Sequence, residues 1–219
     1  MKERPILFSG PMVRAILDGR KTQTRRSENR LLTIGYVQPL ANGDWEWSPY
    51  GSFDHGVIRV NCPYGKIGDR LWVRETWMPD PPRDGTWSSF SWEYDMPIAD
   101  IPERFRTTDH VIHRASWTGE DMVGWKPSIH MPRWASRITL EVTSVRMERL
   151  QEISLEDCKA EGIGPMEICC PAGQHAAQSA IERAYKAAYK LLWNSIYGEG
   201  SWAANSWVWV IEFNRLKNP

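Results

Sequence analysis

The segment that most constrains the fold is residues 207–213, WVWVIEF, which is apolar except for Glu212. A strand with one solvent-exposed face alternates apolar and polar residues, so a nearly continuous apolar run indicates a strand that is covered on both sides. Residues 138–145, ITLEVTSV, show the alternating pattern, and three of them are expected to face the core: Ile138, Leu140 and Val142. The two segments together predict a β-sheet core.

Further strands are predicted from short apolar segments bounded by turn residues. Residues 33–47 are expected to form a hairpin, because the turn dipeptide Asn42-Gly43 lies inside them. Single strands are expected at residues 6–8, 56–60, 71–77 and 111–115. Residues 78–110 are rich in Pro, Asp and Ser, so they are expected to form an irregular insertion over the core.

Three helices are predicted from their ends and their periodicity. The first begins after Ser9-Gly10-Pro11 and ends at Gly19, because proline suits the first turn and glycine suits the residue after the last turn. The second begins at Ser154, which forms a capping box with Asp157, and ends at Gly162. Residues 181–192 have the spacing of an amphipathic helix, which is expected to end before Gly198. The predicted fold class is α+β, with a mostly antiparallel, barrel-like sheet and a few flanking helices.

The composition disfavours several classes of protein. Lys and Arg together number 27, as do Asp and Glu, so the formal net charge is zero and general coating of a polyanion is not expected. No apolar run approaches the roughly 18 residues of a membrane span. No signal-peptide core follows Met1. We therefore expect a cytoplasmic protein with no membrane partner, and the sequence leaves its oligomeric state open.

The cysteines do not predict a metal site. Cys62, Cys158, Cys169 and Cys170 lack C-x-x-C spacing, although His175 lies near the last two. Structural zinc sites have characteristic ligand spacings that are missing here, so reduced thiols are the better interpretation. Neither a metal ion nor another cofactor is expected.

Residues 19–26, GRKTQTRR, concentrate reactive groups in eight positions. Lys21, a candidate base, lies three residues from Thr24, a candidate nucleophile. Positive neighbours should lower the pKa of the Lys21 amine; they are Arg20, Arg25 and Arg26. A solvated basic loop would explain the same composition. Residues three apart share a face in a turn and lie on opposite faces in a strand, and the sequence does not decide between the two.

The spacing Gly19-x-Lys21-x-x-Thr24-x-Arg26 resembles the Gly-x-Lys-x-x-Glu-x-Arg signature of the ASCH family, with threonine in place of the glutamate. The same replacement occurs in ASCH proteins that act as N4-acetylcytidine amidohydrolases. The resemblance continues, in family order, through residues 66–69, 138–163 and 210–213. It implies a single PUA-like β-barrel domain over residues 1–219, of the type found in phages and prophages, with insertions at about 27–55, 78–136 and 164–179.

For function, the resemblance implies a metal-independent amidohydrolase that removes an acyl group from a nucleobase or nucleoside, with N4-acetylcytidine as the implied substrate. Thr24 would be the nucleophile and Lys21 its base. The glutamate that such enzymes take from a later helix corresponds to Glu161, which would carry the proton to the leaving amine. The substrate could be a free nucleoside or part of an RNA.

Other residues near this motif are expected to assist. Arg26 carries the signature arginine and should bind substrate or orient Glu161, with Arg25 beside it as a second binding residue. Glu156 and Asp157 are weaker alternatives to Glu161, because acidic residues in the first turn of a helix stabilise the helix itself.

A second polar and aromatic cluster, His130, Arg133 and Trp134, suits stacking and polar contacts with a base. A loop that is anchored by Trp134 explains it equally well. Two alternative functions stay open: a non-catalytic RNA-binding module, which a PUA-like fold permits, and a ribonuclease that uses the same basic residues. The ribonuclease is less favoured, because none of the five histidines lies beside the motif.

Overall fold

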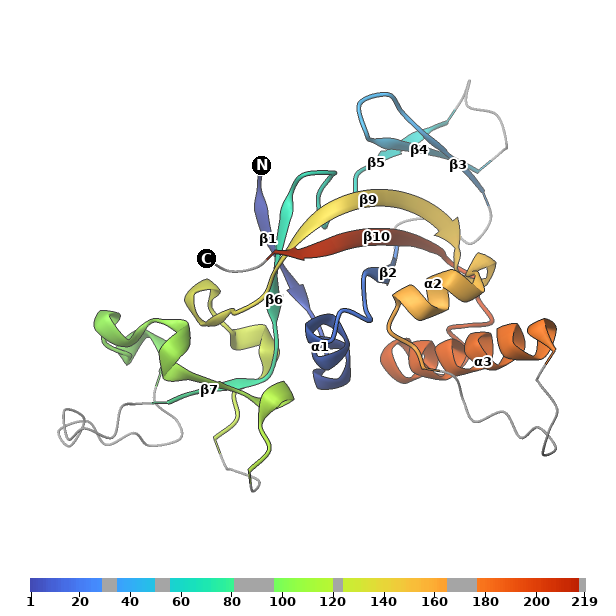
Figure 1. Cartoon of the computed structure of the whole chain (residues 1–219). Helices are drawn as coiled ribbons and strands as arrows, with labels where there is room; N and C mark the ends of the chain where they lie inside the picture. Colours follow the sequence, from blue (N-terminus) through green and yellow to red (C-terminus); the bar gives the residue numbers. More distant parts are fainter. Residues whose placement is uncertain (29–34, 50–55, 81–96, 120–123, 165–176, 217–219) are drawn as a thin grey trace.

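The computed structural model describes residues 1–28, 35–49, 56–80, 97–119, 124–164 and 177–216. Its centre is a five-stranded sheet, in the order β1 (Glu3–Leu7), β6 (Arg70–Arg74), β9 (Thr139–Arg149), β10 (Trp207–Leu216) and β2 (Gln23–Ser27) (Figure 1). β1 and β6 are parallel, whereas the other neighbours are antiparallel. The predicted α+β class, with mostly antiparallel sheets and few helices, is confirmed.

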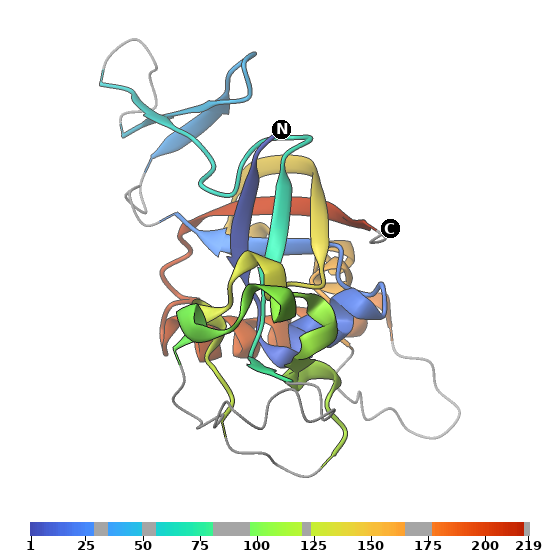
Figure 2. The ribbon, with the colours of Figure 1, turned by 90° about the vertical axis from the view of Figure 1, so that its left-hand side faces the viewer.

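The central sheet is strongly curved. β9 and β10 bend together along their length in Figure 1, and Figure 2 shows β1 and β6 crossing in front of β10 and β2. Among the described residues β1 and β2 are the two edges of the sheet and do not pair with each other. Closure into a PUA-like barrel therefore stays a prediction.

β10 is covered on both faces, as its apolar sequence predicts. Residues 208–211 are fully buried. Trp209 and Ile211 belong to the main core, with Phe8 of the segment after β1 and Val13 of the first helix. The alternate residues of β10 face a second cluster that contains Val208, Val210, Leu150, Tyr189 and Trp193. β10 thus separates two hydrophobic clusters.

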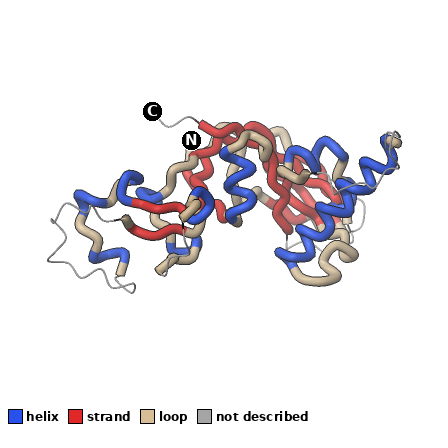
Figure 3. Tube along the Cα trace, turned by 60° about the horizontal axis from the view of Figure 1, so that its bottom comes forward, coloured by secondary structure: helices blue, strands red, loops and turns tan. Residues whose placement is uncertain are grey.

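The helices are α1 (Gly10–Leu17), α2 (Leu155–Ala160) and α3 (Gln178–Tyr197). Figures 1 and 3 show α2 and α3 together on one side of the sheet. The capping box of Ser154 and Asp157 is present, and Gly19 and Gly162 follow their helices at φ +74° and +83°. α3 begins three residues before Ile181 and ends before Gly198, as predicted. In the described part of the chain, no helix is long and apolar enough to cross a membrane.

A small sheet of β3 (Tyr36–Pro39), β4 (Trp45–Ser48) and β5 (Ile58–Val60) contains the predicted hairpin, which turns at Asn42-Gly43. Trp45 packs edge-on against Trp209 at 6.2 Å between ring centroids, which joins this sheet to the main core. The hairpin lies within the insertion that the resemblance implies at 27–55.

The predicted strand at residues 71–77 is divided in two. β6 ends at Arg74, and β7 (Trp77–Pro79) pairs with β8 (Val111–His113) instead. Glu75, between them, is buried and accepts two hydrogen bonds of 3.0 Å from Arg137. The described residues after β7 are irregular, as predicted for residues 78–110, and form mainly 3-10 turns at Ile98–Asp100, Glu103–Phe105, Thr108–His110, Arg114–Ser116, Ser128–His130 and Arg133–Ala135. A further 3-10 turn, Leu150–Glu152, follows β9.

Replacement of Trp209 by Ala should lower the free energy of unfolding by about 3–5 kcal/mol, because it leaves a cavity in the main core beside β10. The change also removes the 2.7 Å hydrogen bond from Trp209 Nε1 to the buried Glu28. Urea denaturation measures the loss. Ile67→Ala, at a side chain that is 68% exposed, is the control and should cost less than about 0.5 kcal/mol. Equal losses for the two variants would contradict the central role of β10.

Candidate active site

A buried ion pair joins the motif at residues 19–26 to the end of α2. The Lys21 amine lies 2.5 Å from Glu161 Oε2, and the two residues are only 2% and 4% exposed. Lys21 Nζ also donates to the carbonyl oxygens of Gln23, at 2.7 Å, and Glu161, at 3.0 Å. All three hydrogens of the ammonium group therefore have acceptors.

The backbone brings these two residues together. Lys21 and Glu161 form an isolated antiparallel bridge, and Thr22 N donates to the carbonyl of Ala160 at 2.8 Å. Gly162 permits the close approach, since a Cβ at this position would lie 2.9 Å from Ala15 Cβ and 3.1 Å from Lys21 Cβ. The glycine that ends α2 is thus also the point where α2 meets α1 and the motif.

Thr24 lies between the two charged groups. The Lys21 amine holds the carbonyl of the peptide group before Thr24, and the Glu161 carboxylate accepts a 2.5 Å hydrogen bond from the N–H of Arg25, in the peptide group after it. Thr24 is 3% exposed, and its hydroxyl makes no hydrogen bond with any residue that the structure describes. The threonine is in strand β2, and the Lys21 amine reaches the carbonyl of Gln23 just before it.

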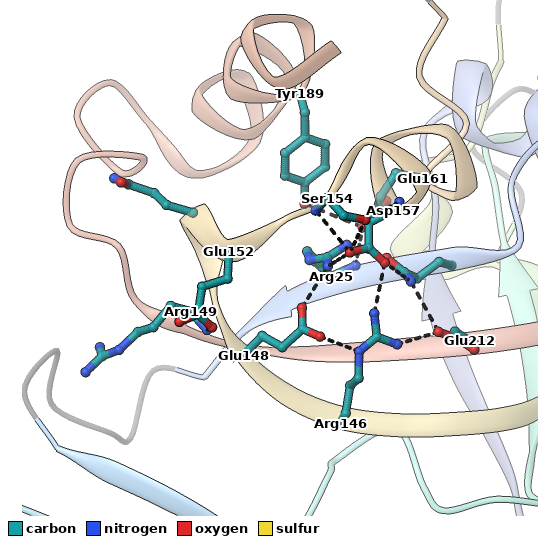
Figure 4. A network of polar contacts seen from close by, with 12 residues as sticks. Arg25, Arg146, Glu148, Arg149, Glu152, Ser154, Asp157, Glu161, Tyr189 and Glu212 are labelled. Atoms are coloured by element: carbon teal, nitrogen blue, oxygen red, sulfur yellow. Dashed lines mark hydrogen bonds and ion pairs between the residues drawn. The ribbon is translucent and has the colours of Figure 1, made fainter. Parts of the chain in front are cut away.

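A narrow pocket opens beside Thr24. Its volume is about 20 Å³, which is room for about one water molecule. The lining residues come from α1, β2, α2 and α3: Met12, Thr24, Arg25, Arg26, Glu161, Tyr189, Leu192, Trp193, Ile196 and Tyr197. Tyr189 points toward Glu161 in Figure 4, and its hydroxyl lies 3.4 Å from Glu161 Oε1.

Burial is the main influence on the ionisation of this site. Burial lowers the pKa of the Lys21 amine. The Glu161 carboxylate raises this pKa part of the way back, and Arg26 and Arg25 lower it further. Arg20 turns away to Asp18, at 3.0 Å, so the positive neighbours of Lys21 are the two arginines that follow it. Burial also holds the pKa of Tyr189 well above its usual value, which keeps this phenol a hydrogen-bond donor.

The two arginines that were predicted to bind substrate differ in position. Arg26 lines the pocket, donates to the carbonyl of Leu7 at 2.5 Å, and lies over the rings of Phe8 and Tyr64. Arg25 also lines the pocket, but its buried guanidinium group pairs with Glu148 at 2.9 Å and Asp157 at 3.0 Å. Arg25 therefore holds Glu161 through its main-chain N–H, while its charge is directed to a polar network.

The second predicted cluster lies elsewhere in the described structure. Arg133 pairs with Glu3 at 3.0 Å, and Trp134 packs edge-on against Trp77 at 5.7 Å. His130 ends an exposed 3-10 turn. None of the three lines the Thr24 pocket, so the geometry favours the anchored-loop interpretation of this cluster.

Sequence reasoning missed the aromatic side of the pocket. Tyr185, Tyr189, Trp193 and Tyr197 recur every four residues of α3, and this stripe was a readable signal. Asp157 was predicted as a helix cap and as a weaker alternative to Glu161, and its contacts with β2 and β9 were not predicted. As for metals, the described residues contain no group of three His, Cys, Asp or Glu side chains that could hold an ion. Cys169, Cys170 and His175 lie outside the described residues.

Comparison of the chain with protein-family models, with curated proteins and with solved structures gave no match. The geometry of the site itself is therefore the basis for a functional proposal.

Replacement of Lys21 by Met should lower the free energy of unfolding by about 3–5 kcal/mol, because it leaves the Glu161 carboxylate buried without its cation. The double variant Lys21→Met/Glu161→Gln should lose clearly less than the sum of the two single variants, since no buried charge then lacks a partner. Urea denaturation at pH 7 measures all three variants. Strictly additive losses would show that the two side chains do not interact.

Proposed function

We propose that this protein is an amidohydrolase that removes an acyl group from a nucleobase or nucleoside, with Thr24, Lys21 and Glu161 carrying the reaction without a metal ion. One observation carries the proposal: the buried Lys21–Glu161 pair holds the peptide groups on both sides of Thr24, whose hydroxyl faces no other partner among the described residues. The resemblance to the ASCH amidohydrolases supports the same three residues and suggests N4-acetylcytidine as substrate.

The pair can supply both proton transfers of amide cleavage. The reaction starts from a neutral Lys21 amine, which takes the Thr24 proton as the hydroxyl oxygen attacks the acyl carbon. Lys21 passes this proton to the Glu161 carboxylate across the 2.5 Å contact, and Glu161 gives it to the leaving amine. The products of this half-reaction are an acyl ester on Thr24 and the free amine.

Water completes the cycle. Glu161, again a carboxylate, takes a proton from the water that attacks the ester and passes it to the Lys21 amine, which gives it to the Thr24 oxygen. The free acid leaves, and both side chains regain their starting protonation. Arg26 lines the pocket, and its Nε–H has no acceptor among the described residues, so we assign to it the binding of the acyl oxygen as negative charge develops.

Substrate entry requires the end of α3 to move. The pocket is too small for a nucleoside, and its rim is formed by Ile196 and Tyr197, which are 49% and 37% exposed. Tyr197 stacks on Trp193 with 4.2 Å between ring centroids. An outward movement of this last turn would open the site and offer aromatic faces on which a base can stack.

The direct test is release of cytidine from N4-acetylcytidine by the purified protein in the presence of EDTA. Thr24→Ala should lower kcat/KM by about a hundredfold or more, because the nucleophile is lost. Thr24→Ser, which keeps the hydroxyl, should retain measurable activity. Thr22→Ala is the matched control, since Thr22 is exposed and contacts its neighbours through its backbone.

Lys21→Ala should also abolish turnover, with circular dichroism used to confirm that the variant folds. Activity that survives both Thr24→Ala and Lys21→Ala would contradict the proposal. Failure to hydrolyse any acylated nucleoside, together with affinity for RNA that weakens steeply with salt, would favour the RNA-binding alternative.

The pH dependence gives a separate prediction. Lys21 acts as a base only when it is neutral, so kcat/KM should rise as the pH passes through its lowered pKa. Arg26→Ala removes a positive charge that lowers this pKa, so the rising limb should move to higher pH. Arg20→Ala is the control and should leave the limb in place, because that guanidinium group lies on Asp18. A profile with no rising limb would mean that Lys21 is a fixed cation.

A further inference from the structure

Figure 4 shows a polar network around Arg25, a residue that also lines the Thr24 pocket. It joins four elements, β2, β9, β10 and α2, through the side chains of Gln23, Arg25, Arg146, Glu148, Asp157 and Glu212. The arginines are its cations: Arg25 is fully buried, and Arg146 is 28% exposed. The proposed reaction uses none of these side-chain contacts.

Asp157 is the member of the network that belongs to α2. Its Oδ1 accepts from Gln23 Nε2 at 2.8 Å and from Arg146 Nη2 at 2.9 Å. Its Oδ2 lies 3.0 Å from Arg25 Nη2 and accepts from the main chain and hydroxyl of Ser154 at 3.1 and 2.9 Å. A helix cap uses only the Ser154 contacts, so the three contacts with β2 and β9 need another explanation.

Those contacts fix the residue that carries the proton in the proposed reaction. Glu161 is one turn after Asp157, and its N–H donates to the Asp157 carbonyl at 2.8 Å. Arg25 holds both ends of this turn, because its guanidinium group binds Asp157 while its N–H binds the Glu161 carboxylate. α2 has only six residues, too few to be stable alone, so its position depends on such contacts.

We propose that Asp157 is a positioning residue that, through Arg25 and Arg146, sets the Glu161 carboxylate against Lys21 and Thr24. This inference rests on the proposed function for its catalytic consequence, whereas the geometric consequence can be measured without any substrate. When α2 is less firmly held, the Glu161 carboxylate moves away from the Lys21 amine, and the amine loses the attraction that favours its charged form.

Two variants with opposite changes of charge separate positioning from a direct electrostatic effect. Asp157→Asn removes a negative charge and weakens the contacts to both arginines. Arg146→Met removes a positive charge and the contact from β9, while the cap of α2 stays intact. A direct field effect would move the Lys21 pKa down in the first variant and up in the second. Loss of positioning should move it down in both.

The measurement is an NMR titration of Lys21 in protein labelled with 13C at lysine, with the signal assigned by its absence in Lys21→Met. The charged or titratable neighbours that could contribute are Arg25, Arg26, Cys158, Glu161 and Tyr189, and both variants retain all of them. Glu212→Gln is the matched control: it removes a charge from the same network, but Glu212 contacts Arg146 and Gln23 and does not contact α2. We expect a clearly smaller shift for this control.

With substrate, Asp157→Asn and Arg146→Met should each lower kcat by roughly tenfold to a hundredfold, because a small displacement of a reacting group has effects of this size. KM should change little, since neither side chain lines the pocket. Opposite pKa shifts in the two variants, or no shift in either, would overturn the positioning role. Downward shifts in both variants of a protein that hydrolyses no acylated nucleoside would uphold that role and refute the proposed function alone.

Discussion

The two-sided burial of β10 is the constraint on which the rest of the structure depends. One face of the strand completes the main core, and the other must be covered by a separate layer, which α3 provides through Tyr189 and Trp193. The same two side chains line the pocket beside Thr24. One helix, α3, therefore covers the apolar strand and also forms part of the candidate site.

Strand β2 connects the pocket with the polar network. Thr24 and Arg26 line the pocket and Gln23 belongs to the network, whereas Arg25 lines the pocket and also binds Asp157. The buried Lys21–Glu161 pair lies where the strand, α1 and α2 meet. Such a pair is weak as a source of stability, because both charges lose their hydration. Its contacts with the peptide groups on both sides of Thr24 are the support for the catalytic role that we propose.

Much of the candidate site followed from the motif and the family resemblance, and the parts that did not have identifiable causes. Lys21, Thr24 and Glu161 do come together, although Glu161 lies far from the motif in sequence. His130, Arg133 and Trp134 do not join them, because Glu3 and Trp77 hold two of the three elsewhere. Asp157 was set aside because an acidic residue in a first turn already has a local role, and only the structure shows its additional partners.

The sequence by itself determined the local structure: the covered strand at residues 207–213, the hairpin at Asn42-Gly43, and the ends of α1 and α2 at Gly19 and Gly162. These features follow from burial periodicity and backbone preference, which act over a few residues. The tertiary structure alone decided that Lys21 pairs with Glu161, that Arg25 turns toward Asp157, and that α3 closes the pocket. Those outcomes depend on the order of the strands and the placement of the helices, because contacts between residues more than a hundred positions apart leave no local pattern in the chain.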